Sequence, residues 1–397
     1  MTKKIWQKTN GQLFDKDVET YTIGLDYILD NSLLPYDIHG SLAHARMLRK
    51  IGILSAAELK ILEKGLNEIL SLWKAGKFAL QRDQEDCHTA IEEFLTTQYG
   101  EVGKKIHTGR SRNDQVLVAL RLFSKDRIDQ IFGLLNVLLK SLDVSIKKYK
   151  AYKMPGYTHM QRAMPTTVAL WLGSYRDSLV DDMKLLTAVR DILDQNPLGS
   201  AAGYGENILG NDRAFTAKEL GFRKVQENPL YCAFSRGKFE NMTLQALSQV
   251  MFDIGKFVTD LMIFTTKEFD FFDLPDSFKT GSSIMPQKKN FDVLELMRGN
   301  VSIFNGYQFQ IQELVRNLPL GYNRDFQLMK EPYFKGMQLM IDSLTMMNHI
   351  VLYLQVNREK LAAACSDDLY ATDEVYKLVR QGHMFRDAYQ IVGKKYL

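Results

Sequence analysis

A short polar stretch near residue 282 combines serine hydroxyls, lysines and an asparagine amide in a pattern that could move a proton. It reads "KTGSSIMPQKKN" over residues 279–290. A serine beside a lysine and several N–H donors can exist transiently as an alkoxide, because those groups stabilise the negative oxygen. An alkoxide at Ser282 could take a proton from a carbon next to a carboxylate, and Lys288 and Asn290 would hold the charge that develops. Gly281 would let the loop close over a substrate. The alternative is a flexible linker whose lysines face solvent.

A second polar stretch, "KIHTGRSRNDQV" over residues 105–116, has the side chains needed to bind carboxylates. Arginine binds carboxylates through two parallel hydrogen bonds, and N–H groups at the start of a helix favour anions. We therefore expect the two arginines, Arg110 and Arg112, together with Ser111, Asn113 and Asp114, to suit the recognition of a carboxylate. The alternative is that Arg112 and Asp114 only pair with each other.

A histidine in "MPGYTHMQRAMPTT", residues 154–167, is a candidate for acid or base chemistry. His159 lies in a polar joint between two expected helices rather than on an apolar stripe, which argues against a core histidine. Glu295, five residues after Asn290, falls early on a further expected helix, where it could orient an imidazole. Pairing with a carboxylate fixes the tautomer of a histidine and raises its basicity.

Several common kinds of site do not fit this sequence. Gly281 lacks the second glycine that a P-loop requires, and no strand precedes it. The glycines of "PLGSAAGYGENILG" (197–210) are spaced wrongly for a dinucleotide-binding turn, and no GxSxG hydrolase motif occurs at the serine pair. The seven histidines include no HxxxH or HxxH pair, which argues against zinc and leaves magnesium open.

Charge and cysteine content narrow the class of protein further. The net charge is +4, and the basic residues are interleaved with acidic ones. This favours a small anionic substrate over nucleic acid, which would need a concentrated basic face. Three widely spaced cysteines without a CxxC motif indicate a reducing compartment, so we expect a cytoplasmic protein. The start of the chain lacks the apolar segment of a signal peptide, and no apolar run is long enough to span a membrane.

The elements that must position these side chains are expected to be long helices. Five segments carry apolar residues at alternating spacings of three and four, which is the pattern of one helical face. The stripes run from Ile128 to Tyr149, Val168 to Leu193, Leu244 to Leu261, Leu294 to Val315 and Met337 to Leu354. Each helix is expected to run for about 25–30 residues, which corresponds to a length on the order of 40 Å. The second helix is expected to start just after Pro165, since proline suits a first helical turn.

Helices of this length are uncommon in compact monomers and usual in elongated bundles. Leu185 and Ile192 widen the apolar face of the second stripe, and Phe257 and Phe264 that of the third, as expected for a bundle that packs between subunits. A monomeric helical bundle is the alternative. Strand signals are weak, and no βαβ alternation occurs. We expect a mainly α chain with an N-terminal helical domain at 1–110, a central long-helix bundle at 111–360 and a short C-terminal helical segment at 361–397.

Taken together, these stretches resemble the argininosuccinate lyase family within the fumarase/aspartase superfamily of lyases. "GSSIMPQKKN" resembles the superfamily signature GSSxMPxKxN, and "HTGRSRNDQV" and "MPGYTHMQRAMP" resemble two further blocks in their argininosuccinate lyase form. The resemblance runs from "PYDIHGSLAHARML" (35–48) to "LYATDEVYKLVRQGHMFRDAYQIVGK" (369–394). It implies a three-domain fumarase/aspartase-like fold and a homotetramer built around long helices, whose active sites are shared between subunits. It also implies cleavage of argininosuccinate to arginine and fumarate by β-elimination, without metal or organic cofactor.

The resemblance also implies a role for individual residues. Ser282 matches the general base, Lys288 and Asn290 the groups that hold the charged carboxylate, and His159 with Glu295 the acid side. Positions that match substrate-binding residues of the family are Asp30, His88, Ser111, Arg112, Asn113, Thr158, Tyr322, Gln327 and Lys330.

A few positions depart from the family pattern. Phe291 replaces the usual proline after the signature, Leu328–Met329 replaces an acidic pair, and Gly237–Lys238 replaces acidic and aromatic residues. Family members usually continue for several helices beyond the final "GKKYL". Two other functions therefore remain open: another fumarate-releasing lyase, such as an adenylosuccinate lyase, and a catalytically silent crystallin-like structural protein.

Overall fold

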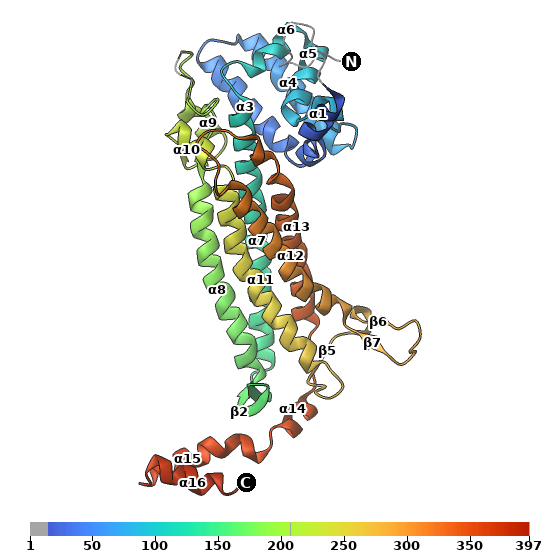
Figure 1. The fold of residues 1–397 in the computed structure, drawn as a ribbon, viewed down its shortest axis with the longest axis vertical. Coiled ribbons are helices and arrows are strands. Elements are labelled where there is room, and N and C mark those ends of the chain that lie inside the picture. The colour runs from blue at the N-terminus through green and yellow to red at the C-terminus, as the bar shows by residue number, and fades with distance from the viewer. Residues whose placement is uncertain (1–14, 207, 397) are drawn as a thin grey trace. The chain divides into compact units, whose positions relative to one another are not determined.

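The computed structural model describes residues 15–206 and 208–396, and it is mainly helical, as the sequence predicts (Figure 1). Its contacts divide the chain into two compact units. Unit 1 comprises Met1–Asp129, Leu186–Gln245 and Tyr307–Met337, and unit 2 comprises Gln130–Leu185, Ala246–Gly306 and Gln338–Leu397. The three-part division expected from the sequence stays a prediction.

Five long helices have residues in both units. They are α7 (Arg112–Lys148), α8 (Val168–Leu193), α11 (Lys238–Phe264), α12 (Asp292–Val315) and α13 (Lys330–Tyr353). These are the five helices expected from the apolar stripes. Most stripe residues are buried, including every member of the stripe that begins at Met337 on α13 and ends at Leu354, just after that helix.

The other elements of unit 1 are short helices and one pair of two-residue strands. The helices are α1 (Lys16–Ile23), α2 (Asp26–Leu29), α3 (Leu34–Lys50), α4 (Ala56–Lys74), α5 (Cys87–Tyr99), α6 (Glu101–Lys104), α9 (Arg213–Glu219) and α10 (Pro229–Phe234), and the parallel strands are β3 (Gln195–Asn196) and β4 (Lys224–Val225). Ser55 starts α4 with a capping box, since its side chain bonds the backbone of Glu58 and the Glu58 side chain bonds back. Gly65 lets α4 pack closely on α5, because a Cβ there would lie 2.5 Å from Leu95 Cδ2.

In unit 2, parts of the five long helices lie side by side (Figure 1). Trp171 on α8 stacks on Phe257 of α11 with ring centroids 5.3 Å apart, and its Nε1 donates to Asp260. The remaining elements are the hairpin β1 (Lys153–Thr158) and β2 (Gln161–Thr167), the strand pairs β5 (Phe272–Asp273) with β8 (Gln355–Val356) and β6 (Thr280–Gly281) with β7 (Lys289–Asn290), and the helices α14 (Arg358–Ala364), α15 (Ala371–Arg380) and α16 (Phe385–Gly393). All three of these strand pairs are antiparallel.

One local expectation needs correction. Pro165 does not open a helix: it pairs with Pro155 inside the β1–β2 hairpin, and α8 begins at Val168. Leu185 and Ile192, which were expected to widen the apolar face of α8 for packing between subunits, are 45% and 39% exposed in the single chain, whereas Phe257 and Phe264 are buried within it. The expected packing between subunits stays a prediction.

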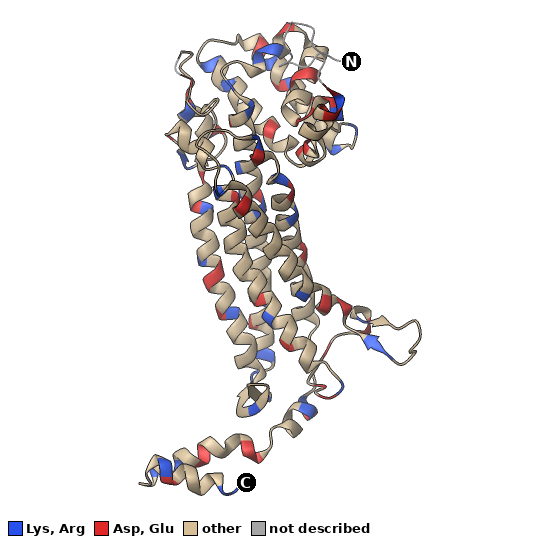
Figure 2. Ribbon diagram, viewed as in Figure 1, with Lys and Arg blue, Asp and Glu red and all other residues tan. Residues whose placement is uncertain are grey.

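Charged residues are distributed over both units. Lysine and arginine are interleaved with aspartate and glutamate along the helices (Figure 2). Among the described residues, no helix is both long and apolar enough to cross a membrane.

Candidate functional site

Unit 1 contains a polar cavity of about 180 Å³ that collects many of the expected substrate-binding residues. Its lining comprises Ile23, Asp26, Glu85, Asp86, His88, Arg112, Asn113, Val116, Arg236, Tyr322, Arg324, Gln327 and Lys330. Six of these were expected from the sequence: His88, Arg112, Asn113, Tyr322, Gln327 and Lys330. They come from α5, α7, α13 and the segment that precedes α13, so the fold brings together stretches that are far apart in the chain.

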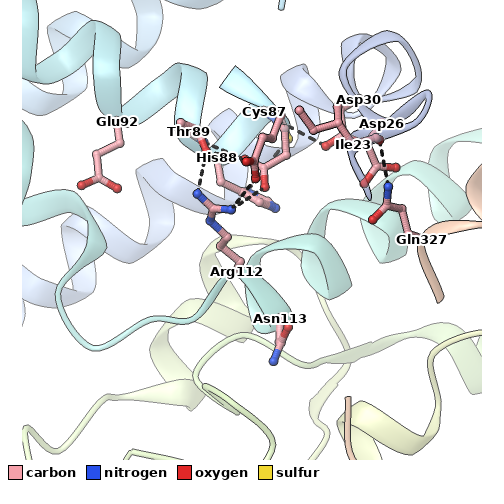
Figure 3. A network of polar contacts seen from close by, with 12 residues as sticks. Ile23, Asp26, Asp30, Cys87, His88, Thr89, Glu92, Arg112, Asn113 and Gln327 are labelled. Carbon is pink, nitrogen blue, oxygen red and sulfur yellow. Dashed lines mark hydrogen bonds and ion pairs between the residues drawn. The ribbon is translucent and has the colours of Figure 1, made fainter. Parts of the chain in front are cut away.

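Arg112, the first residue of α7, is held by the start of α5 (Figure 3). Its Nη2 donates to Thr89 Oγ1 at 2.8 Å, and its Nη1 lies 3.3 Å from Asp86 Oδ2 and 3.5 Å from Glu85 Oε2. Arg112 therefore pairs with α5 and not with Asp114, the alternative raised by the sequence. Its guanidinium is fixed in place on the cavity wall before any ligand arrives.

Asp114 and Ser111 instead form the N-terminal cap of α7. The backbone N–H of Ser111 donates to Asp114 Oδ1, and the backbone N–H of Asn113 donates to Ser111 Oγ. Asp114 Oδ2 also accepts from the N–H groups of Gly199 and Ala201, each at 3.0 Å. Burial raises the pKa of Asp114 to about 6 despite these donors. Ser111 does not line the cavity, because its hydroxyl serves the cap.

His88 forms a buried ion pair with Asp37 of α3. Its Nδ1 lies 2.5 Å from Asp37 Oδ2. Burial alone would lower the pKa of His88, but the charge and hydrogen bond of Asp37 raise it above the usual value. Burial opposes the charge on Asp37 as well, and attraction to His88 nevertheless holds the pKa of Asp37 below its usual range. Because Nδ1 is occupied, Nε2 is the ring nitrogen that can serve a ligand in the cavity.

Lys330 anchors the other side of the cavity through two carboxylates. Its Nζ donates to Asp30 Oδ1 at 2.7 Å and lies 3.3 Å from Asp26 Oδ1. Burial alone would lower the pKa of Lys330, but Asp30 and Asp26 raise it above its ordinary range. Asp30 also accepts the backbone N–H of Cys87 and is not itself part of the lining. Asp30 therefore orders Lys330 and the start of α5 together.

Cys87 completes the only group of possible cation ligands in residues 15–206 and 208–396. Asp37, Cys87 and His88 present ligand atoms within 4.8 Å of one another. These atoms already pair among themselves, and the Cys87 thiol donates to Asp37 Oδ2 at 3.3 Å. Burial raises the pKa of Cys87 well above its usual value, so the thiol keeps its proton in this network.

Five charged lining residues were not singled out as site residues from the sequence: Asp26, Glu85, Asp86, Arg236 and Arg324. Asp26 could have been found from the sequence by its spacing, since it lies four residues before Asp30 and therefore on the same helical face. Glu85 and Asp86 directly precede the Cys87–His88 pair. Arg236 follows α10, and only the fold brings it to this cavity.

The proposed base lies in unit 2, in the loop between β6 and β7. Ser282 follows β6 directly, and its Oγ accepts the backbone N–H groups of Ile284 and Met285 at 3.3 and 3.1 Å. Two donors aimed at one oxygen are the local arrangement that stabilises an alkoxide. Lys288 is exposed, and Asn290, the last residue of β7, is half-buried.

The base of this loop is held by charged contacts around Phe291. Lys279 donates to Asp273 and Asp276 and lies 5.5 Å from the centre of the Phe291 ring. The carbonyl oxygen of Phe291 accepts the N–H of Leu294 at 2.9 Å. Phe291 therefore directly precedes α12 at the position of the family's proline, and its ring lies against Lys279, the residue before β6.

His159 and Met160 form the two-residue turn of the β1–β2 hairpin. Thr158 pairs with Gln161, and the two turn residues have φ angles of 51° and 62°. Positive φ at both positions is normally supplied by Asn-Gly or Gly-Gly, so a histidine and a methionine there carry backbone strain. Strain retained at an exposed histidine points to a role in function.

Glu295 was expected to orient His159, and the single chain does not join them. Glu295 lies exposed in the first turn of α12, and no hydrogen bond or ion pair between these two described residues is formed. The candidate residues thus fall into two groups. Unit 1 holds Asp30, His88, Ser111, Arg112, Asn113, Tyr322, Gln327 and Lys330; unit 2 holds Thr158, His159, Ser282, Lys288, Asn290 and Glu295.

Comparison with known proteins places this arrangement in a family. A sequence model described as "Lyase" matches residues 15–303. The chain belongs to this lyase family. It is 47% identical to an argininosuccinate lyase of Thermotoga neapolitana over 100% of this chain and 99% of that protein. It is also 42% identical to an argininosuccinate lyase of Bacteroides thetaiotaomicron, over 99% of this chain and 87% of the relative. The family resemblance found in the sequence is confirmed, and so is the expectation that the chain is an enzyme.

Solved structures confirm the fold of the lyase. An EDDS lyase in complex with formate superposes with a TM-score of 0.82 at 23% identity, covering 96% of this chain and 76% of that one. A class II fumarase from Schistosoma mansoni superposes with a TM-score of 0.80 at 17% identity, covering 95% and 87%. At these identities the likeness shows the fumarase/aspartase-like fold alone.

Proposed function

We propose that this lyase cleaves argininosuccinate to arginine and fumarate by β-elimination. The observation that carries the proposal is the 47% identity, over essentially the full length of both chains, to a protein named argininosuccinate lyase. The relatives described above share that name, which favours this substrate over adenylosuccinate. The substrate is a small molecule, and the proposed reaction needs no metal or organic cofactor.

In the proposed reaction, Ser282 starts the elimination as an alkoxide. Its oxygen removes a proton from the succinyl carbon next to a carboxylate, and Lys288 and Asn290 hold the second negative charge that forms on that carboxylate. The electron pair then becomes the double bond of fumarate as the carbon–nitrogen bond breaks. The leaving nitrogen takes a proton from the side of the site where His159, oriented by Glu295, is proposed to act, with Thr158 beside it. The two N–H groups at Ser282 Oγ support the first step.

The unit 1 cavity is proposed to bind the substrate. Arg112, Asn113 and His88 offer donors to its carboxylates, while Tyr322, Gln327, Lys330 and Asp30 surround the amino-acid end. The preformed contacts of Arg112 and Lys330 support this assignment, because a fixed cation loses little freedom when an anion binds.

We propose a homotetramer in which each active site takes residues from more than one subunit. Apolar side chains on the long helices of unit 2 support this assembly: Val144, Leu170 and Leu296 are 66%, 69% and 68% exposed in the single chain. Exposed apolar residues on bundle helices are typical of faces that pack against other subunits.

The three free cysteines support a cytoplasmic location.

The test is a fumarate-release assay on the purified protein, followed by ultraviolet absorbance, with argininosuccinate and adenylosuccinate as substrates. We expect fumarate only from argininosuccinate. Release from adenylosuccinate alone would contradict the proposed substrate, and release from neither would favour the silent structural protein.

A further inference from the structure

Two acidic side chains meet between two long helices of unit 2. Asp182 lies on α8 and Asp253 on α11, and their carboxyl groups are in hydrogen-bond contact with each other. Asp253 is only 7% exposed, and Asp182 is half-buried. The Oδ2 atoms of both are buried and, within the described part of the chain, receive no hydrogen-bond donor. Buried polar atoms without a partner call for an explanation.

The charges around this contact do not neutralise it. From α8, Asp181 adds negative charge near Asp182, although it is itself paired with Lys184 at 2.7 Å. From α11, Lys256 attracts Asp253 from a distance, and it forms no ion pair with either carboxyl group among the described residues. The two acids therefore meet without a cation of the described chain between them.

A third carboxylate at the same interface shows how α8 can satisfy an acid on α11. Asp260 lies two turns after Asp253, and it accepts Trp171 Nε1 at 2.9 Å and the Tyr175 hydroxyl at 2.7 Å, both from α8. Tyr175 also faces Asp253 but gives its proton to Asp260. The hydroxyl of Ser178 is the donor that α8 offers to Asp253, and the next partner across the interface is another acid.

Two carboxyl groups in contact keep one proton between them, because two like charges at this distance repel strongly. Burial and the charge of Asp253 raise the pKa of Asp182 to about 7. Burial also raises the pKa of Asp253, against the hydrogen bonds of Ser178 and Asp182 and the attraction of Lys256. Asp182 therefore holds the proton and donates it to the Asp253 carboxylate. This hydrogen bond between the helices exists only while the proton is bound.

The two helices lead to the exposed candidate groups of unit 2. α8 begins directly after the hairpin that carries His159, and α11 ends at Phe264, ahead of β5 and the loop of Ser282. We propose that Asp182 and Asp253 form a proton-dependent link, which holds α8 to α11 while the shared proton is bound and pushes them apart when it is lost. The link goes beyond the proposed reaction, because neither residue belongs to the candidate site.

The test is the pH dependence of the thermal midpoint of the full-length protein. Since the folded-state pKa of Asp182 lies above the ordinary value of about 3.9, the stability that the link contributes is fully present below about pH 4 and is lost as the pH rises through about 7. In Asp182→Asn the amide donates without a titrating proton. From about pH 5 to 8.5, the midpoint of the wild type should fall by about 1–3 °C relative to that of Asp182→Asn.

Asp253→Asn should remove this pH dependence in the same way, since an amide on either side supplies the N–H. Asp177→Asn is the matched control, because Asp177 is exposed on α8 and pairs with Arg176, and it should keep the wild-type dependence. Infrared difference spectra at about pH 6 should show a protonated carboxylic acid in the wild type that is missing from Asp182→Asn.

Three results would overturn the proposal. A midpoint lowered equally at every pH in Asp182→Asn would leave the pair a packing role. A difference spectrum without the acid band would show that no proton is shared. Magnesium chloride that stabilises the wild type at about pH 8.5 and leaves Asp182→Asn unchanged would show that a metal cation, rather than a proton, joins the two carboxylates.

Discussion

The two units present their candidate residues in opposite ways. In unit 1 the key side chains are already paired: the half-buried Arg112 with the start of α5, and the buried His88 and Lys330 with Asp37 and Asp30. In unit 2, His159 is on an exposed hairpin turn, and Ser282 is on an exposed loop with only backbone donors at its oxygen.

We infer from this difference that unit 1 binds the substrate and that unit 2 supplies the groups that carry out the reaction. A buried network keeps binding groups in place within one chain, which suits recognition. Groups exposed on turns have no such support in the single chain, so we infer that a neighbouring subunit completes their surroundings. The following experiments test this contrast between the two units.

The largest expected effect is on the chemistry of unit 2. Ser282→Ala should lower the rate of fumarate release by about 10²- to 10⁴-fold, the usual contribution of a general base. The thermal midpoint should stay unchanged, because the hydroxyl contacts only its own loop. Ser283→Ala, one residue further on in the same exposed loop, is the control and should retain activity. Near-normal turnover in Ser282→Ala would contradict the proposed base.

The next effect is on the buried network of unit 1. Lys330→Met leaves Asp30 and Asp26 without their cation, so we expect the free energy of unfolding to fall by about 3–5 kcal/mol, measured by urea denaturation. Lys335→Met on the same helix breaks only an exposed pair with Glu331 and should cost far less. Similar losses in the two variants would show that unit 1 is not organised by its buried charges.

A smaller effect on stability is expected at the His88–Asp37 ion pair, and it should depend on pH. The raised pKa of His88 contributes stability that is fully present below about pH 6.5 and is lost as the pH rises through the folded-state value. The lowered pKa of Asp37 contributes stability that is present above about pH 3.9 and is lost as the pH falls through its folded-state value.

Asp37→Asn should therefore lower the free energy of unfolding by about 1–3 kcal/mol, with the largest loss between about pH 4 and 6.5. The thermal midpoint should fall most in the same pH range. Melting curves recorded across this range test the expectation. A deficit that is the same at every pH would indicate lost packing rather than a lost ion pair.

The smallest effect concerns the strained turn of unit 2. Met160→Gly should raise the free energy of unfolding by about 1 kcal/mol, because glycine adopts positive φ without strain, and should leave His159 and turnover in place. Met164→Gly, in β2 of the same hairpin, is the control, since Met164 does not have a positive φ, and should destabilise. A loss of stability in Met160→Gly would show that the turn is not strained.

The long helices could be predicted from the sequence because their apolar spacing is set by the geometry of the helix itself. The β1–β2 hairpin could not, since Pro155 and Pro165 interrupt the alternation of a strand and His159–Met160 is not a usual turn pair. The signature loops and their residues were recognisable because they are contiguous in the chain. Asp26 and Arg236 were not, because they meet in one cavity only after residues more than two hundred positions apart have packed together.

The division of labour between the units is tested most directly by mixing two inactive variants. Ser282→Ala damages only unit 2, and Arg112→Gln damages only unit 1. The two chains would be co-expressed with different tags, purified as hybrids and assayed for fumarate release beside each variant alone. If sites take unit 1 and unit 2 from different subunits, some sites in the hybrids contain no substitution, and activity should return. Hybrids as inactive as the two parents would contradict shared sites, because every site would then lie within one damaged chain.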